Sequence, residues 1–300
     1  MLQFAGIRVA GKPYMIGSVR RLVLGLALAF AATFALAAGA ASADQPVDLE
    51  LVLAIDVSGS IDADEAKLQR DGYMQAFLDP LVVRAIQAGE RGAITVAYVE
   101  WASYNQRRTV VDWMVIKDEA SSRAFVAELA RNPPIIGMST SISGAIEYGL
   151  NLFGKGGYKG ARRVIDISGD GPNNSGGMVT FARDRAIASG VTINGLPVLN
   201  DRPNRMNFPT LPDLDLYYEG CVIGGPGAFV VVAQDFVNFA HAIRQKLILE
   251  IAGRVPDRRT RFAAPRRAPS LARPAEYVYP KGCDVGERQS REFFRNRSFD

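Results

Sequence analysis

Histidine and cysteine are nearly absent from this chain of 300 residues. It contains one histidine, His241, and two cysteines, Cys221 and Cys283. Zinc sites built on two or more histidines are therefore excluded, as are sites of four thiolates. A Ser-His-Asp triad would need His241, whose apolar helical neighbours are more typical of a packed or half-exposed side chain. The sequence Gly-x-x-x-x-Gly-Lys-Ser/Thr is also missing, which excludes a P-loop nucleotidase.

The middle of the chain also lacks an excess of basic residues, although the whole chain has a formal net charge of +4. Residues 1–43 contain four basic residues and no acidic one, and residues 254–300 have a net charge of +6. Residues 44–253 contain 19 Lys or Arg and 25 Asp or Glu, which is a net charge of −6. A mildly acidic body argues against nucleic acid as a partner. The 48% hydrophobic content predicts that this body folds around a core.

The first 43 residues have the pattern of an export signal. The basic pair Arg20-Arg21 precedes an apolar run at 22–36, and Ala41-Ser42-Ala43 fits a small-x-small cleavage site. We therefore expect a signal peptide at 1–43, with Asp44 as the first residue of a periplasmic or secreted protein. The basic region is unusually long, and a start at Met15 would give it an ordinary length.

The alternative for this segment is an uncleaved transmembrane anchor. Leu22 to Ala41 is 20 residues, which is just long enough to span a bilayer. The Ala-rich end of the run and the cleavage site favour removal. Contact with a membrane is expected only through this segment or through the basic tail.

Export changes the interpretation of the two cysteines. In an oxidising compartment, Cys221 and Cys283 are expected to form a disulfide bond, which would join the tail to the body. The alternative is one buried thiol and one exposed thiol.

Strand and helix patterns alternate along the body. Apolar runs predict strands at 48–56, 93–101, 107–116, 163–168, 191–199 and 228–233. Helical periodicity predicts helices at 62–81, 118–130, 141–153, 176–189 and 234–251. The short link between the second and third strands favours a hairpin. We therefore predict one α/β domain at 44–253, with a doubly wound, mostly parallel, Rossmann-like sheet that has one antiparallel strand and helices on both faces.

Carboxylates and hydroxyls follow several of these elements. Asp56, Ser58 and Ser60 come at the end of the first strand, Thr140 opens a predicted helix, and Asp170 follows the strand at 163–168. Ligands of such sheets bind beyond the carboxyl ends of the strands. Each piece alone is also typical of a turn or a helix cap. Together they predict a site made of hard oxygen ligands, which suits Mg²⁺, Mn²⁺ or Ca²⁺ rather than zinc or copper.

Over residues 48–251 the sequence resembles the von Willebrand factor type A family. That family's metal-ion-dependent adhesion site is Asp-x-Ser-x-Ser, then a Thr, then an Asp, and all five predicted ligands match it. The departures are Ser139, where the family commonly has Gly, and the long segment 200–227, where it usually has a short helix. Residues 217–225 (YYEGCVIGG) also resemble a subfamily of exported bacterial proteins with this domain, which suggests a periplasmic address and no assigned activity.

The resemblance implies how the five residues would act. In the family the two Ser and the Thr bind Mg²⁺ directly or nearly so, the two Asp often act through water, and a partner protein's carboxylate takes a remaining position. It implies an exported, metal-dependent protein-interaction module whose partner presents an Asp or a Glu. The alternative is a metal-assisted hydrolase of phosphoesters or similar substrates, with Glu100 or Asp166 as general base. The sequence shows no catalytic base in a clear position and no triad.

Three weaker features complete the expectations. Asp166 lies within a strand, where an unpaired carboxylate is costly, and we expect it to pair with Arg162, Arg163 or backbone donors. A role behind the metal ligands is the alternative. Glu100 is expected either to line the partner surface or to be a polar residue of the hairpin. Residues 173–174 (Asn-Asn) are typical of a solvated turn, with contact to a ligand as the alternative.

The last segment, 254–300, is rich in Arg and Pro and has little apolar periodicity. We expect a solvated, largely flexible extension. The alternative is contact with an acidic surface, such as anionic lipid or a protein partner.

Overall fold

The computed structural model describes residues 44–199, 210–236, 238–253 and 278–297. The predicted signal peptide, the first part of the 200–227 segment and the arginine runs of the tail lie outside the described residues. Among the helices of the described part, none is both long and apolar enough to cross a membrane.

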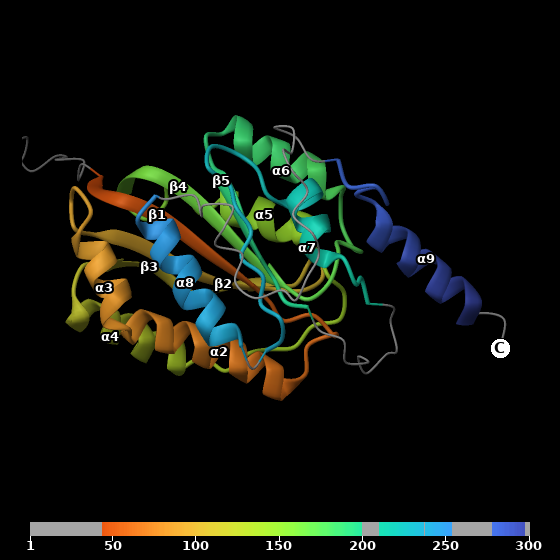
Figure 1. Cartoon of the computed structure of the whole chain (residues 1–300), viewed down its shortest axis with the longest axis horizontal. Helices are drawn as coiled ribbons and strands as arrows, with labels where there is room; N and C mark the ends of the chain where they lie inside the picture. Colours follow the sequence, from red (N-terminus) through yellow and green to blue (C-terminus); the bar gives the residue numbers. More distant parts are fainter. Residues whose placement is uncertain (1–43, 200–209, 237, 254–277, 298–300) are drawn as a thin grey trace, which may run out of the picture. The chain divides into compact units, whose positions relative to one another are not determined.

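The centre of the fold is a five-stranded sheet in the order β3-β2-β1-β4-β5 (Figure 1). Its strands are β1 (Gln45–Asp56), β2 (Ile94–Trp101), β3 (Arg107–Ile116), β4 (Tyr158–Gly169) and β5 (Thr192–Pro197). The hairpin partner β3 is antiparallel to β2, and the other neighbouring pairs are parallel. The predicted fold class is confirmed.

Helices cover both faces of this sheet. The described residues form α2 (Ala63–Leu78), α3 (Pro80–Gln87), α4 (Glu119–Ala130), α5 (Ile142–Leu150), α6 (Val179–Ala188), α7 (Leu214–Tyr217), the π-helical turn η1 (Tyr218–Val222), α8 (Phe239–Ile251) and α9 (Val285–Arg297), of which α9 extends away from the sheet (Figure 1). Two separate hydrophobic clusters show the division: α2, α3, α4 and α8 contribute to one, and α5, α6, α7 and η1 to the other (Figure 1).

The central strand β1 supplies both clusters. Leu49, Leu51 and Leu53 belong to the first cluster, whereas Val52 and Ala54 belong to the second. Side chains alternate between the faces of a strand, so a strand buried on both faces needs a continuous apolar run. That run ends at Asp56, where the chain leaves the sheet.

The predicted helix at 62–81 is divided into α2 and α3. Asp79 ends α2 with extended backbone, and its carboxylate accepts a 2.7 Å hydrogen bond from the Leu81 N–H. Pro80 begins α3, a position where its missing N–H would have no partner in any case. The residue before a proline is disfavoured in helical geometry, so the break is local in origin.

The predicted strand at 228–233 is not part of the regular sheet. It runs beside β5 through isolated parallel bridges, Gly195 with Val230 and Val198 with Ala233. Between these bridges lies Pro197, which accepts from the Ala233 N–H through its carbonyl but has no N–H to donate. The ladder is interrupted at that point, and the expected sixth strand is only an edge segment.

Two features of the C-terminal part add to the predicted elements. Helix α9 lies in the tail, where no helix was expected. The predicted disulfide between Cys221 and Cys283 is present, with 5.5 Å between the two Cα atoms. It joins the residues just before α9 to η1.

Candidate metal centre

The parallel pairing of β1 and β4 brings the first and last predicted ligands to one edge of the sheet. Ile55 pairs with Ser168, so Asp56 ends β1 close to the point where Asp170 follows β4. Ser58 and Ser60 lie in the turn after β1, and Thr140 lies just before α5. This is the edge where the carboxyl ends of the parallel strands meet.

A continuous series of hydrogen bonds joins the five predicted residues. The Asp56 carboxylate accepts from the Ser58 N–H at 2.7 Å, and the Ser58 and Ser60 hydroxyls are 3.2 Å apart. The Ser60 hydroxyl donates to Asp170 at 2.6 Å. The Thr140 hydroxyl donates to Ser58 Oγ at 3.2 Å. Three chain segments therefore present two carboxylates and three hydroxyls to one another.

Asn173 and Asn174 form hydrogen bonds to the segment that contains Thr140 and the start of α5. The prediction that they lie in a solvated turn is therefore wrong. The Asn174 side chain accepts from the Thr140 N–H at 2.9 Å, and its own N–H donates to the Thr140 carbonyl at 2.9 Å. Asn173 is fully buried, and its side chain accepts from the Ser143 N–H at 2.9 Å in the first turn of α5. An amide side chain both donates and accepts, which suits a residue that links several segments.

Two glycines allow the segments to come this close. A Cβ at Gly59 would lie 2.9 Å from the Met138 carbonyl oxygen. A Cβ at Gly169 would lie 2.8 Å from Asp56 Oδ2. Both distances are too short for a side chain, so glycine is required for close approach at these positions.

The electrostatics of Asp56 fit a bound cation. Asp56 is fully buried, and its Oδ2 has no hydrogen-bond partner among the described residues. Burial, followed by the negative charge of Asp170, holds the pKa of Asp56 well above its usual range. A divalent cation among these oxygens would offset both effects, and a set of carboxylates and hydroxyls is the type that Mg²⁺, Mn²⁺ and Ca²⁺ accept. Within the described part of the chain, no group of three or more His, Cys, Asp or Glu offers another metal site.

The two carboxylates considered as general bases are engaged elsewhere. Glu100 is buried between Arg70 and Arg108, with 2.7 Å to the second, so it does not line a partner surface. Asp166 is 2.6 Å from Lys246 of α8, and the expected pairing with Arg162 or Arg163 is wrong. The hydrolase alternative therefore has no support from either residue.

Arg162 and the single histidine have other contacts. The Arg162 guanidinium donates to the Glu250 and Ile251 carbonyls at the end of α8. His241 is exposed on α8, with Gln245 Nε2 at 2.7 Å from its ring, and it lies on a different element from the five residues. It is therefore more exposed than the packed or half-exposed side chain that was expected.

The loop before Thr140 carries exposed apolar side chains. In the loop before Thr140, the side chains of Ile135 and Met138 are 54% and 71% exposed. This loop is held against the Ser58 turn, because the Gly59 N–H donates to the Met138 carbonyl at 3.1 Å.

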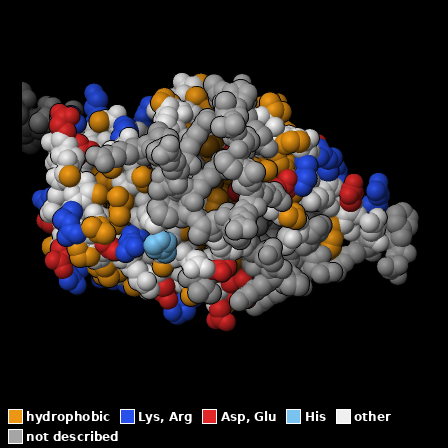
Figure 2. All heavy atoms as spheres, in the orientation of Figure 1, with side chains coloured by type: hydrophobic (Ala, Val, Ile, Leu, Met, Phe, Trp, Pro, Cys, Tyr) orange, Lys and Arg blue, Asp and Glu red, His pale blue; other side chains and the backbone are white. Residues whose placement is uncertain are grey.

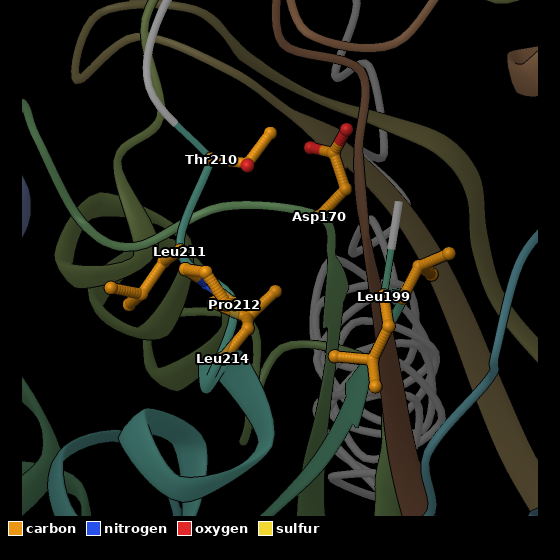
Figure 3. A pocket seen from close by; sticks show the side chains of 7 residues that line it. Asp170, Leu199, Thr210, Leu211, Pro212 and Leu214 are labelled. Carbon is orange, nitrogen blue, oxygen red and sulfur yellow. The ribbon is translucent and has the colours of Figure 1, made fainter. Parts of the chain in front are cut away.

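On another side, a small pocket reaches Asp170. It is lined by Asp170, Val198, Leu199, Thr210, Leu211, Pro212 and Leu214, with Asp170 and Thr210 together at one end (Figure 3).

On the face seen in Figure 2, acidic and basic side chains are interspersed rather than gathered by sign.

Several solved structures are similar to this chain at low identity. Proximal thread matrix protein 1 of the mussel byssus, solved with a zinc-occupied MIDAS motif, has a TM-score of 0.48 and 16% identity, over 70% of this chain and 47% of that one. A von Willebrand factor type A protein from Catenulispora acidiphila has a TM-score of 0.46 and 15% identity, over 69% of this chain and 43% of that one. BatB from Bacteroides thetaiotaomicron has a TM-score of 0.40 and 19% identity, over 68% of this chain and 99% of that one. The chain thus spans less than half the length of the first two.

At these identities and TM-scores, the similar structures do not indicate the function of this chain. No curated protein matches the chain. A family model matches residues 46–255, which include all five predicted ligands and all of the sheet except Gln45. The chain therefore belongs to the family described as "Protein of unknown function (DUF1194)".

Proposed function

We propose that residues 44–253 form a protein-binding module that depends on a divalent cation. The observation that carries this proposal is the hydrogen-bonded set of Asp56, Ser58, Ser60, Thr140 and Asp170. It includes a buried carboxylate oxygen of Asp56 that has no hydrogen-bond partner among the described residues. A fully buried carboxylate beside a second one is unfavourable unless a cation or proton compensates it. The module would keep this arrangement because the cation is part of its binding surface.

The five residues would divide the work by their chemistry. The hydroxyls of Ser58, Ser60 and Thr140 would be neutral ligands, so the cation would keep enough positive charge to attract an outside carboxylate. Asp56 and Asp170 would neutralise part of the charge. When bound, Mg²⁺, Mn²⁺ or Ca²⁺ supplies an electrophilic position for an oxygen ligand. Asn174 would hold Thr140 in place through its two hydrogen bonds to that residue's backbone.

The partner in this proposal is a protein that presents an Asp or a Glu. The exposed Ile135 and Met138 side chains, and the pocket beside Asp170, would flank the arriving carboxylate with apolar surface (Figure 3). Water is more easily excluded from a polar contact that is surrounded by apolar groups, which strengthens the contact. No nucleic acid is involved in this function.

We also propose that the protein is exported, to the periplasm or out of the cell. Two independent features support this. Residues 1–43 have the sequence of a cleavable signal, and both cysteines of the chain form a disulfide bond. Disulfides form and persist mainly in oxidising compartments.

Selection from a library of displayed random peptides tests the proposed function. The immobilised protein is exposed to the library in Mg²⁺, and bound peptides are released with EDTA. We expect Asp and Glu to be enriched among the released peptides, and binding to be lost when that acidic residue is changed to Asn or Gln. The Asp56→Ala protein should release no such peptides, whereas Asp112→Ala, at an exposed position on β3, should behave as wild type. Equal recovery from the wild type and Asp56→Ala would contradict the proposal.

A further inference from the structure

Residues 279–287, which we name the C-terminal brace, are fastened to the segment at 211–222 by several contacts. The Cys221–Cys283 disulfide is the covalent one. The Lys281 ammonium is 2.7 Å from the Asp213 carboxylate. The Tyr279 ring is buried against Tyr217, with 5.6 Å between ring centroids in an edge-to-face arrangement. The brace is therefore held by covalent, ionic and apolar contacts together.

The far end of the brace contacts the loop that carries Asp170. The Asn173 side-chain N–H₂ donates a 2.7 Å hydrogen bond to Glu287 in the first turn of α9. A Cβ at Gly286 would lie 2.2 Å from the Asn173 carbonyl oxygen and 3.0 Å from Pro172. No methyl group fits between α9 and this loop, so the backbone of α9 packs directly on it.

Asn173 connects the brace to the segments that carry the five residues of the proposed metal site. Its side chain also accepts from the Ser143 N–H at 2.9 Å, and its N–H donates to the Tyr217 hydroxyl at 3.2 Å. Asp170 lies three residues before it, and Asn174, which holds the Thr140 backbone, follows directly. The same short loop therefore positions two of the five residues and is fixed on its outer side by the brace.

We propose that the C-terminal brace positions Asp170 and Thr140 for the cation, so that the Cys221–Cys283 disulfide contributes to the metal affinity of the site. This inference rests on the proposed function. Without the brace, the loop at 170–174 loses its contacts to Gly286 and Glu287, and binding a cation must also order the loop. A ligand set that is ordered in advance binds more tightly, because less conformational entropy is lost on binding.

The test is the dissociation constant for Mn²⁺, measured by titration of the full-length protein under non-reducing conditions. We expect Gly286→Ala, and separately the pair Cys221→Ala with Cys283→Ala, to raise it by about tenfold, the lower end of what loss of a ligand-orienting contact costs. Alanine favours a helix more than glycine does, so any loss in Gly286→Ala comes from the contact with the loop. Both proteins are measured well below their unfolding temperatures, so that lower stability alone does not change the result.

Variants at Glu287 separate positioning from general structure. Glu287→Ala removes the acceptor for Asn173 and should also weaken Mn²⁺ binding. Glu287→Gln keeps an oxygen acceptor and should restore binding close to the wild-type value. The matched control is Glu292→Ala, because Glu292 is exposed on the same helix. If Gly286→Ala does not fold, the Glu287 variants carry the test.

The outcomes distinguish the two proposals. If the wild type binds Mn²⁺ and all variants bind it equally well, the role of the brace is overturned and the proposed function stands. If the wild type does not bind Mn²⁺, Mg²⁺ or Ca²⁺, the proposed function is overturned and this inference with it. Loss of binding in Glu287→Gln as great as in Glu287→Ala would also overturn the positioning role.

Discussion

Asp166 and Lys246 form a buried ion pair between β4 and α8, and both side chains are fully buried. Glu250 lies 3.4 Å from the same ammonium, and Asn194 of β5 donates to Glu250 at 2.6 Å. Two carboxylates thus share one ammonium in the interior. Burial raises the pKa of Asp166 to about 7, with Lys246 lowering it and Glu250 raising it.

The sign of this shift determines a dependence on pH. The ordinary pKa of an aspartate in an unfolded chain is about 3.9. Because the folded-state pKa of Asp166 is higher, the neutral carboxyl favours the folded state. The stabilisation from this group is fully present below about pH 4 and is lost as the pH rises to about 7.

We therefore predict that Asp166→Asn reduces the pH dependence of stability. Asn has nearly the shape of a protonated Asp but does not ionise. The free energy of unfolding of the wild type, relative to the variant, should fall between pH 5 and pH 7. Urea unfolding of both proteins in EDTA at several pH values measures this difference. A difference that is constant over that range would show that Asp166 is ionised throughout in the folded protein.

At the scale of elements, the division between α2 and α3 depends on Asp79. Its Oδ1 accepts from the Leu81 N–H at 2.7 Å and caps α3, while its Oδ2 is 3.2 Å from Arg244 of α8. The cap satisfies a backbone N–H that has no partner within the helix, whereas a partly exposed ion pair contributes little. The two contributions can be separated because they use different partners.

We predict that Asp79→Ala lowers the free energy of unfolding by about 1 kcal/mol, the usual cost of losing a helix cap. For a domain of this size, that corresponds to a fall of about 2–4 °C in Tm. Arg244→Ala removes the ion pair and an exposed contact with His241 but leaves the helix cap intact, so it should cost less than half as much. Calorimetry of the three proteins decides between them, and equal losses would assign the stabilisation to the ion pair. Both variants should keep the wild-type response to Mg²⁺, since neither residue belongs to the metal site.

At the scale of the whole molecule, a bound cation would stabilise the entire fold. The five residues come from three segments that are distant in the sequence, so unfolding separates them and releases the cation. A ligand at 100 times its dissociation constant stabilises the folded state by about 2.7 kcal/mol.

We predict a rise in Tm of about 5–10 °C when EDTA-treated protein receives Mg²⁺, Mn²⁺ or Ca²⁺ at such a concentration. The ion that gives the rise at the lowest concentration is the preferred one. Asp56→Ala should show no rise, and Asp112→Ala should show the full rise. A rise of the same size in the wild type and Asp56→Ala would place the bound cation elsewhere in the protein.

Local patterns were sufficient to predict most elements. Apolar runs, alternation and cap residues located all five strands and most of the helices, because these signals are read over a few neighbouring residues. The hairpin of β2 and β3 was predicted from its short link. The missed break at Asp79-Pro80 is local in origin, whereas the other errors lie where a contact distant in sequence decides the outcome. Pro197 of β5 interrupts pairing with residues 228–233, and the disulfide partner Cys221 holds the residues before α9.

The residues alone were enough to predict the fold class, the grouping of five oxygen-bearing residues and the pairing of the two cysteines, with two free thiols as the alternative to that pairing. Each depends on residue type and order along the chain. Which charges meet depends on the packing of distant elements. Lys246 rather than Arg162 pairs with Asp166, and Asn173 joins the Asp170 loop to α5 and α9. A local pattern cannot show these partners, because they are brought together only when helices from distant parts of the sequence pack on the two faces of the sheet.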